Sequence, residues 1–134
     1  NKKTVSKDVL EFAYNNDYII INVKQGYSRC SICVINENSI ITDDKSIFTS
    51  AGNFLNDAEL ISKGSILLNG YNYGFIGGCC GKLSKNEIGF NGMIESHKDY
   101  KKIIDILSRN NIKCTELCKT RLTDIGGIIP LTEF

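Results

Sequence analysis

The chain has 134 residues, a formal net charge of +1 at pH 7 and hydrophobic residues at 42% of its positions. This length and composition predict one domain of ordinary size with an apolar core. Acidic and basic residues are interspersed, so no basic stripe predicts a nucleic-acid partner. No apolar run approaches the length of a membrane-spanning helix, so no membrane partner is predicted either.

The first 24 residues predict a helix followed by a strand. Apolar residues recur at helical spacing within residues 5–16. Residues 17–24 then carry a mostly apolar run, from Tyr18 to Val23 with Asn22 as its polar member, that is typical of a buried strand.

The segment of residues 25–73 predicts two strands, a helix and a further strand. Residues 31–35 and 39–42 are apolar and flank a polar turn, which predicts a hairpin. A short helix is expected over residues 45–53, capped by one of the two aspartates that precede it. The apolar residues 58–62 predict the strand that follows the helix.

The segment of residues 74–121 predicts the same order of elements. A hairpin is expected over residues 79–90, with one more residue in its turn than the first hairpin has. Tyr100, Ile103, Ile104 and Leu107 lie at helical spacing and predict an amphipathic helix. Cys114 to Cys118 is the expected strand after this helix.

A recurring tripeptide marks where each of these segments begins. Ile76-Gly77-Gly78 recurs as Ile125-Gly126-Gly127, and a degenerate copy is Arg29-Cys30-Ser31. The separation of these copies along the sequence is typical of proteins built from structural repeats. The sequence therefore predicts an α/β fold of repeated strand, strand, helix, strand (ββαβ) modules, with residues 1–24 ending one module and residues 122–134 starting another.

About two and a half to three modules are too few to bury every sheet edge and apolar face. We therefore expect upstream modules of the same protein, or a partner chain, to complete the fold. The alternative interpretation is a mature 134-residue domain that has lost a leader.

The six cysteines favour reduced thiols and a cytoplasmic location, because no export signature is present and Cys79 and Cys80 are adjacent. Cys30 and Cys33 have metal-site spacing, but residues three apart on a strand point to opposite faces. Completing a site around Cys114 would need ligands from another module. We predict no metal and no cofactor.

Glycines gather within residues 70–81, where a strand interior should avoid them unless backbones approach closely. One interpretation is that paired glycines let neighbouring strands converge at a common axis. The other is that they leave room for a ligand there. A phosphate-binding loop is not predicted, because no helix begins directly after the glycines and no Lys-Ser or Lys-Thr pair follows them.

Several motifs, in order and spacing, resemble an uncharacterised bacterial family. They are Lys24-Gln25-Gly26-Tyr27-Ser28-Arg29-Cys30-Ser31, Gly74-Phe75-Ile76-Gly77-Gly78, Phe90-Asn91-Gly92 with His97, and Leu122-Thr123-Asp124-Ile125-Gly126. That family is similar to the pentein superfamily, five-bladed α/β propellers of ββαβ modules that include guanidine-modifying enzymes (GMEs) and a non-catalytic ribosome anti-association factor. The resemblance implies a pentein-like propeller and covers residues 21–131.

The resemblance also implies a catalytic set in which a Cys nucleophile, a His acid or base and acidic residues surround a guanidinium group. The matching candidates are Cys30, His97 and Asp124, with Cys79 and Cys80 as rivals to Cys30.

The chain departs from the patterns of these families in three places. No Cys follows Cys118, although the enzymes of the superfamily carry their nucleophile near the C-terminus. Met93 follows Gly92 where the uncharacterised family has Asp, and Asp124 is followed by Ile125 where that family has Arg.

Each candidate also has a structural interpretation. Cys30 could be a core residue, His97 an exposed residue at the start of a helix, and Asp124 an acceptor for backbone amides beside Gly126. The sequence leaves open whether the protein is an enzyme.

We predict a protein of undetermined function that binds a small ligand at the propeller axis without established catalysis, using Lys24, Arg29, Gly77, Gly78 and Cys79. The alternative is a Cys- and His-dependent hydrolase or amidinotransferase acting on a guanidine or amide. A ribosome or protein partner is a third interpretation that follows from the superfamily alone.

Overall fold

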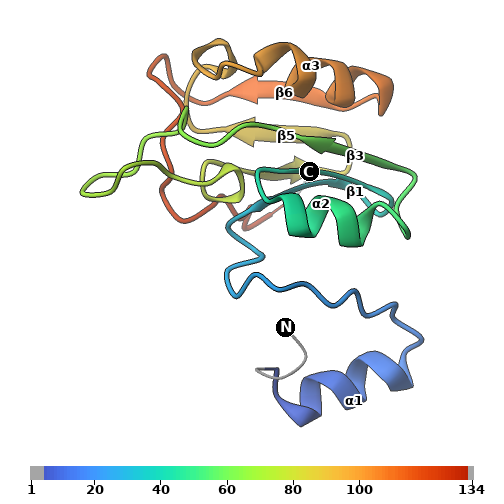
Figure 1. Cartoon of the computed structure of the whole chain (residues 1–134). Helices are drawn as coiled ribbons and strands as arrows, with labels where there is room; N and C mark the ends of the chain where they lie inside the picture. The colour runs from blue at the N-terminus through green and yellow to red at the C-terminus, as the bar shows by residue number, and fades with distance from the viewer. Residues whose placement is uncertain (1–4, 133–134) are drawn as a thin grey trace.

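The computed structural model describes residues 5–132, so the outermost residues of the expected first and last modules lie outside the described part. Within it, the chain is a mixed α/β protein with two three-stranded sheets and three α-helices (Figure 1). In chain order the elements are α1 (Lys7–Asn15), β1 (Ile32–Asn36), β2 (Ser39–Thr42), α2 (Lys45–Ala51), β3 (Asp57–Leu60), η1 (Ile76–Gly78), β4 (Cys80–Ser84), β5 (Glu87–Phe90), η2 (Ile94–Ser96), α3 (Tyr100–Arg109) and β6 (Lys113–Glu116).

The first sheet has the strand order β1-β2-β3, with β1 antiparallel and β3 parallel to β2. The parallel pairing requires a crossover, which α2 supplies. Asp44 caps the start of this helix, and its carboxylate accepts the backbone N–H groups of Ser46 at 2.8 Å and Ile47 at 3.0 Å. Ile47 and Ala51 are its buried residues.

The second sheet has the order β4-β5-β6, the same strand directions and a crossover through α3. Each β1–β2 pair recurs as a β4–β5 pair 48 residues later, and the same irregularity precedes both turns, where Asn36 pairs with Ser39 and Ser84 with Glu87. The two turns therefore have equal length, and the longer second turn expected from the sequence is wrong. The described residues form these two sheets and no closed ring of them.

The amphipathic pattern of α3 predicted its buried face with one exception. Ile103 and Leu107 are buried as expected, and Ile106 joins them, whereas Ile104 is 44% exposed. Ile106 and Leu107 follow Ile103 by three and four residues, so the three side chains share the buried side of the helix, and Ile104 points away from them.

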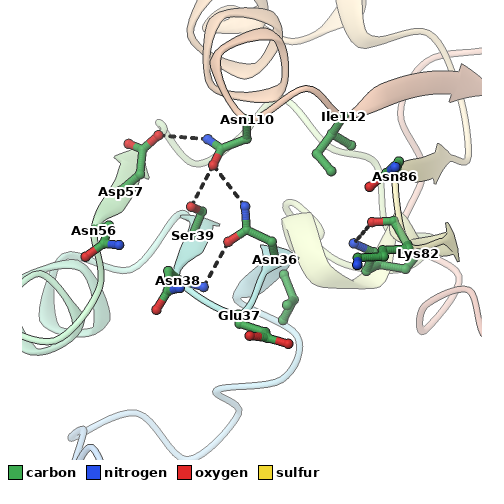
Figure 2. Close-up of a pocket in the computed structure, with 12 residues that line it drawn as sticks. Asn36, Glu37, Asn38, Ser39, Asn56, Asp57, Lys82, Asn86, Asn110 and Ile112 are labelled. Atoms are coloured by element: carbon green, nitrogen blue, oxygen red, sulfur yellow. Dashed lines mark hydrogen bonds between the residues drawn. The ribbon is translucent and has the colours of Figure 1, made fainter.

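A polar network joins the end of α3 to the first sheet (Figure 2). The side-chain oxygen of Asn110 accepts hydrogen bonds from Asn36 Nδ2 at 2.9 Å and Ser39 Oγ at 2.8 Å. Its nitrogen donates to Asp57 at 2.8 Å, and the Arg109 guanidinium binds the same carboxylate at 2.7 and 2.8 Å. These contacts hold α3 against all three strands of the first sheet.

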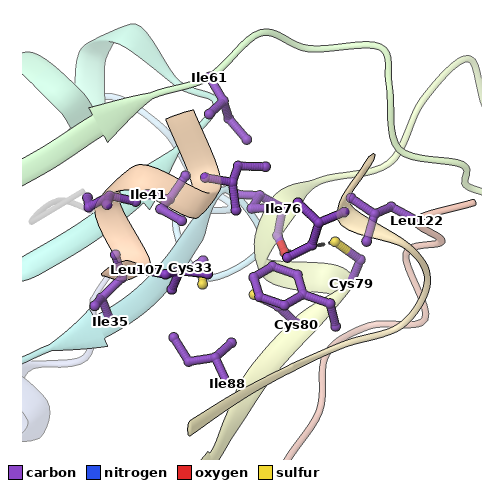
Figure 3. Close-up of a cluster of buried hydrophobic side chains, with 14 of the residues drawn as sticks. Cys33, Ile35, Ile41, Ile61, Ile76, Cys79, Cys80, Ile88, Leu107 and Leu122 are labelled. Atoms are coloured by element: carbon purple, nitrogen blue, oxygen red, sulfur yellow. Dashed lines mark hydrogen bonds between the residues drawn. The ribbon is translucent and has the colours of Figure 1, made fainter. Parts of the chain in front are cut away.

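A single cluster of buried apolar residues joins both sheets (Figure 3). Cys33, Ile35 and Ile41 come from the first sheet, while Ile88 and Phe90 come from the second. Because one contiguous core serves both sheets, they are expected to unfold together.

The predicted strand over residues 17–24 is wrong. No strand lies there, and Tyr18 and Ile19 are 62% and 71% exposed. Only Val23 is buried, and it packs in a small cluster with Ile40 and Ile47. An apolar run becomes a strand only where another strand offers hydrogen-bonding partners, and neither sheet pairs with this segment.

The predicted helix before it is present as α1, but none of its residues is buried. It is set apart from the two sheets (Figure 1), and Val9, Phe12 and Tyr14 are exposed. Among the helices of residues 5–132, none combines the length and the hydropathy that crossing a membrane requires.

Candidate functional site

The three tripeptide segments aligned in the sequence meet in space. The backbone N–H of Gly77 donates to Cys30 O at 2.7 Å, and the Arg29 guanidinium donates to Gly77 O at 3.0 Å. On the other side, Ile125 N–H donates to Gly78 O at 3.0 Å. We call this meeting point, formed by residues 29–31, 76–78 and 125–127, the glycine junction.

Glycine is required at two positions of the junction because other atoms occupy the space where a Cβ would lie. A Cβ on Gly77 would collide with the backbone oxygens of Arg29 and Ile32. A Cβ on Gly78 would collide with the Asp124 carboxylate. Backbone segments thus approach closely at these glycines, as one interpretation of the sequence expected, but residues 76–78 form η1 rather than a strand, and convergence of strands at a common axis stays a prediction.

Asp124 holds the junction through both of its carboxylate oxygens. One accepts the Phe75 N–H at 2.9 Å and the other accepts the Gly126 N–H at 2.9 Å. These bonds fit the structural interpretation of Asp124 as an acceptor for backbone amides. Each oxygen accepts one of these two bonds, so both are held by the backbone of the junction.

A pocket of about 260 Å³ lies beside the junction, between β1, β4 and the chain after Gly127. We call it the junction pocket. Its walls are mostly apolar, and they are formed by Arg29, Ile32, Cys33, Val34, Cys80, Gly81, Lys82, Ile128, Ile129 and Pro130. The chain after Gly127 approaches β4 closely and closes one side of the pocket. The approach is so close that a Cβ on Gly81 would collide with Ile128 O.

Two cations line the junction pocket, and their surroundings differ. Lys82 Nζ donates to Ile35 O at 2.7 Å and Lys85 O at 2.6 Å, so its ammonium is engaged by carbonyl groups. Arg29 donates one bond to Gly77 O, and none of the ion pairs within residues 5–132 includes it. Arg29 is thus the cation with donors left for a ligand.

All six cysteines are free thiols. Burial raises the pKa of the Cys79 thiol, and the neighbouring Cys33 together with burial raises that of Cys80. Burial likewise raises the pKa of Cys114 to about 11. These three thiols stay protonated at neutral pH, which makes them poor nucleophiles. Within the described residues, no cluster of His, Cys, Asp and Glu could hold a metal ion.

His97 is buried, with 1% of its surface exposed, in contrast to the structural interpretation of an exposed residue. Its Nδ1 accepts the Asp99 N–H at 3.0 Å, while Nε2 has no hydrogen-bond partner within residues 5–132. Burial lowers the pKa of His97, so the imidazole is neutral at pH 7. Neither nitrogen is bonded to Cys30 or Asp124.

The structure thus brings together part of the set expected from the sequence. Arg29, Cys30, Gly77, Gly78 and Asp124 meet at the glycine junction, whereas Cys79 lies beneath it with its thiol donating to Ile76 O at 3.3 Å. Lys24 is exposed and does not line the junction pocket.

Sequence reasoning missed Cys33 and Cys80 as pocket residues. Gly81 carried the one signal that could have found this wall, because a glycine inside a strand indicates another backbone close by.

Asp43 carries a buried carboxylate beside the junction. Its side chain is 5% exposed; one oxygen accepts the Ile76 N–H at 3.4 Å, and the other has no partner, as is also true of the buried Ser31 hydroxyl. Burial raises the pKa of Asp43 because the charged form loses its hydration. The equivalent position after β5 is occupied by Asn91, a neutral residue of the same shape.

Replacing Asp43 with asparagine is expected to stabilise the protein at pH 7, by about 1 kcal/mol. A raised folded-state pKa means that the wild-type carboxyl favours folding below its ordinary pKa of 3.8 and loses that contribution as pH rises through the folded value. The advantage of Asp43→Asn should therefore be largest near neutrality and vanish in acid. Urea unfolding of both proteins across pH 3–8 measures this difference, and an advantage that grows in acid would contradict it.

The model of a protein family of unknown function, DUF6873, matches residues 1–129, and the chain therefore belongs to this family. No curated protein and no solved structure matches the chain.

Proposed function

We propose that this protein binds a small carboxylic acid in the junction pocket and does not transform it. The observation that carries the proposal is the Arg29 guanidinium, which lines a mostly apolar pocket without an acidic partner. A guanidinium matches the planar geometry of a carboxylate and binds it through parallel hydrogen bonds. Its bond to Gly77 O fixes the group in place before a ligand arrives.

The walls of the pocket define the rest of the ligand. Ile32, Ile128 and Ile129 offer apolar contacts, and the volume of about 260 Å³ suits a ligand with a short apolar body. A polyphosphate would need further cations, and Lys82 is already engaged by two carbonyl oxygens. A monocarboxylate of a few carbons fits both the charge and the size.

The alternative of a Cys- and His-dependent hydrolase or amidinotransferase remains a prediction from resemblance. It requires a thiolate with a base beside it. The neutral His97 makes its one hydrogen bond to Asp99, and no bond links it to Cys30. The binding proposal has the better support because its central residue lines a pocket.

We also propose that the two sheets are two modules of a pentein-like propeller, with the glycine junction near its axis. The matching strand order, strand directions and pairing register support this arrangement. Further modules of the same protein, or a partner chain, would then cover exposed apolar residues such as Phe12, Ile129 and Leu131. A structure of the assembly in which the sheets lack a common axis would contradict it.

The ligand proposal is tested with butyrate and its neutral amide, butyramide, which differ in charge and hardly in shape. We expect saturation-transfer NMR to detect butyrate binding and to show weaker binding of butyramide. Arg29→Gln should reduce butyrate affinity at least about tenfold, which is the loss expected when a hydrogen bond to a charged group is removed. Arg29→Lys keeps the charge but loses the planar fork, so it should retain part of the affinity.

The matched control is Arg121→Gln, which removes an exposed arginine that does not line the junction pocket. It should bind butyrate as the wild type does. Equal binding of butyrate and butyramide, or equal losses in the Arg29 and Arg121 variants, would show that the junction pocket does not select a carboxylate.

A further inference from the structure

A second and larger cavity lies at the opposite ends of β1 and β4, between the turns of the two hairpins. Its volume is about 670 Å³, and we call it the amide groove because asparagines dominate its lining (Figure 2). It is separate from the junction pocket apart from Val34 and Lys82, which line both. The ligand proposal for the junction pocket does not involve this groove.

One wall of the groove is rigid because its polar groups bind one another. Asn36, Ser39 and Asp57 all bond to Asn110, as described above. Arg109 neutralises the Asp57 carboxylate through two hydrogen bonds. A charged ligand would therefore find no unpaired countercharge on this wall.

The rim of the groove differs, because its carboxamides are not engaged. The side chains of Asn38, Asn56 and Asn86 are exposed, line the groove and form no hydrogen bond within residues 5–132. Their backbone groups, in contrast, are held: Asn56 N–H donates to Asn38 O at 3.0 Å, and Lys113 N–H donates to Asn86 O at 2.8 Å. The three carboxamides are therefore free to bond a ligand from fixed backbone positions, and ordering their side chains costs part of the binding free energy.

The chemistry of this lining points to a neutral ligand with many hydroxyl groups. Each carboxamide presents two N–H donors and one acceptor oxygen, and a sugar hydroxyl both donates and accepts. Glu37 adds an acceptor at the rim, while Val34 and Ile112 offer apolar contact for the carbon face of a ring. From these observations we propose that the amide groove binds a saccharide of about two rings.

The proposal is tested by saturation-transfer NMR with maltose and cellobiose, each at about 10 mM. No aromatic side chain lines the groove, so we expect a Kd on the order of 1 mM for at least one disaccharide. The double variant Asn56→Ala, Asn86→Ala should lose this signal. Asn53→Ala, at an exposed asparagine outside the groove, and Arg29→Gln, in the junction pocket, should keep it.

Three results would overturn the assignment. One is that neither maltose nor cellobiose gives a saturation-transfer signal. Another is a signal that survives in the double variant or disappears in Arg29→Gln, because the sugar would then bind elsewhere. The third is binding of the peptide trialanine with both sugars silent, which would make the groove a peptide site.

Discussion

Replacing Gly77 with alanine is expected to destabilise the protein by about 3 kcal/mol, which would lower Tm by about 10 °C. The added methyl group has no space, because the backbone oxygens of Arg29 and Ile32 already lie where it would be placed. Backbone atoms cannot rotate away as a flexible side chain can. The segment after Gly26 would have to shift, and the hydrogen bond from Gly77 N–H to Cys30 O would be strained or lost.

Gly26→Ala is the matched control for this substitution. No atom lies within 4 Å of a Cβ added to Gly26, and the residue is exposed. Thermal unfolding followed by circular dichroism should therefore show a change of at most about 0.5 kcal/mol for Gly26→Ala. Similar Tm values for the Gly77 and Gly26 variants would mean that the close convergence at the glycine junction is not present in solution.

The secondary structure of both sheets could be predicted because its signals are local. Hairpins such as β1–β2 combine apolar strands with a polar turn, and α3 has an amphipathic stripe that a single sequence reveals. The apolar run that ends at Val23 carries an equally strong strand signal and forms no strand. Whether such a run pairs depends on a neighbouring strand, which the local sequence cannot specify.

The glycine junction could be predicted in part because repetition of a tripeptide implies equivalent positions. Because two segments share the sequence Ile-Gly-Gly, we could predict correctly that another backbone segment lies close to Gly77. The wall of the junction pocket could not be predicted in this way, since Cys33 and Cys80 come from strands of separate sheets. Their proximity follows from how the sheets pack, and no local pattern encodes that packing.

The environment of a single titratable residue could not be predicted from the sequence either. His97 precedes a helix in the sequence, which was compatible with an exposed residue at the helix start as well as with a catalytic one. Burial and a bond from Asp99 N–H make it a neutral structural group here. Asp43 and Asp44 show the same problem, because only Asp44 caps α2 whereas Asp43 turns inward toward Ile76.

The shared core leads to the second large effect, which is expected for Phe90→Ala. Phe90 is fully buried in the cluster that joins both sheets, and removing its ring should cost about 3–5 kcal/mol. Phe90→Leu should lose less, about 1–1.5 kcal/mol, because leucine fills part of the space. Phe54→Ala removes a ring that is 52% exposed and should change stability by at most about 0.5 kcal/mol.

Calorimetry of Phe90→Ala also tests whether the two sheets form one cooperative unit. Phe90 belongs to the second sheet, but its cluster includes Ile35 and Ile41 of the first. Loss of the ring should therefore shift one transition for the whole chain to lower temperature, with equal calorimetric and van't Hoff enthalpies. If instead the melting curve split, with one part at the wild-type temperature, the first sheet would be stable on its own. The buried cluster would then not couple the two sheets.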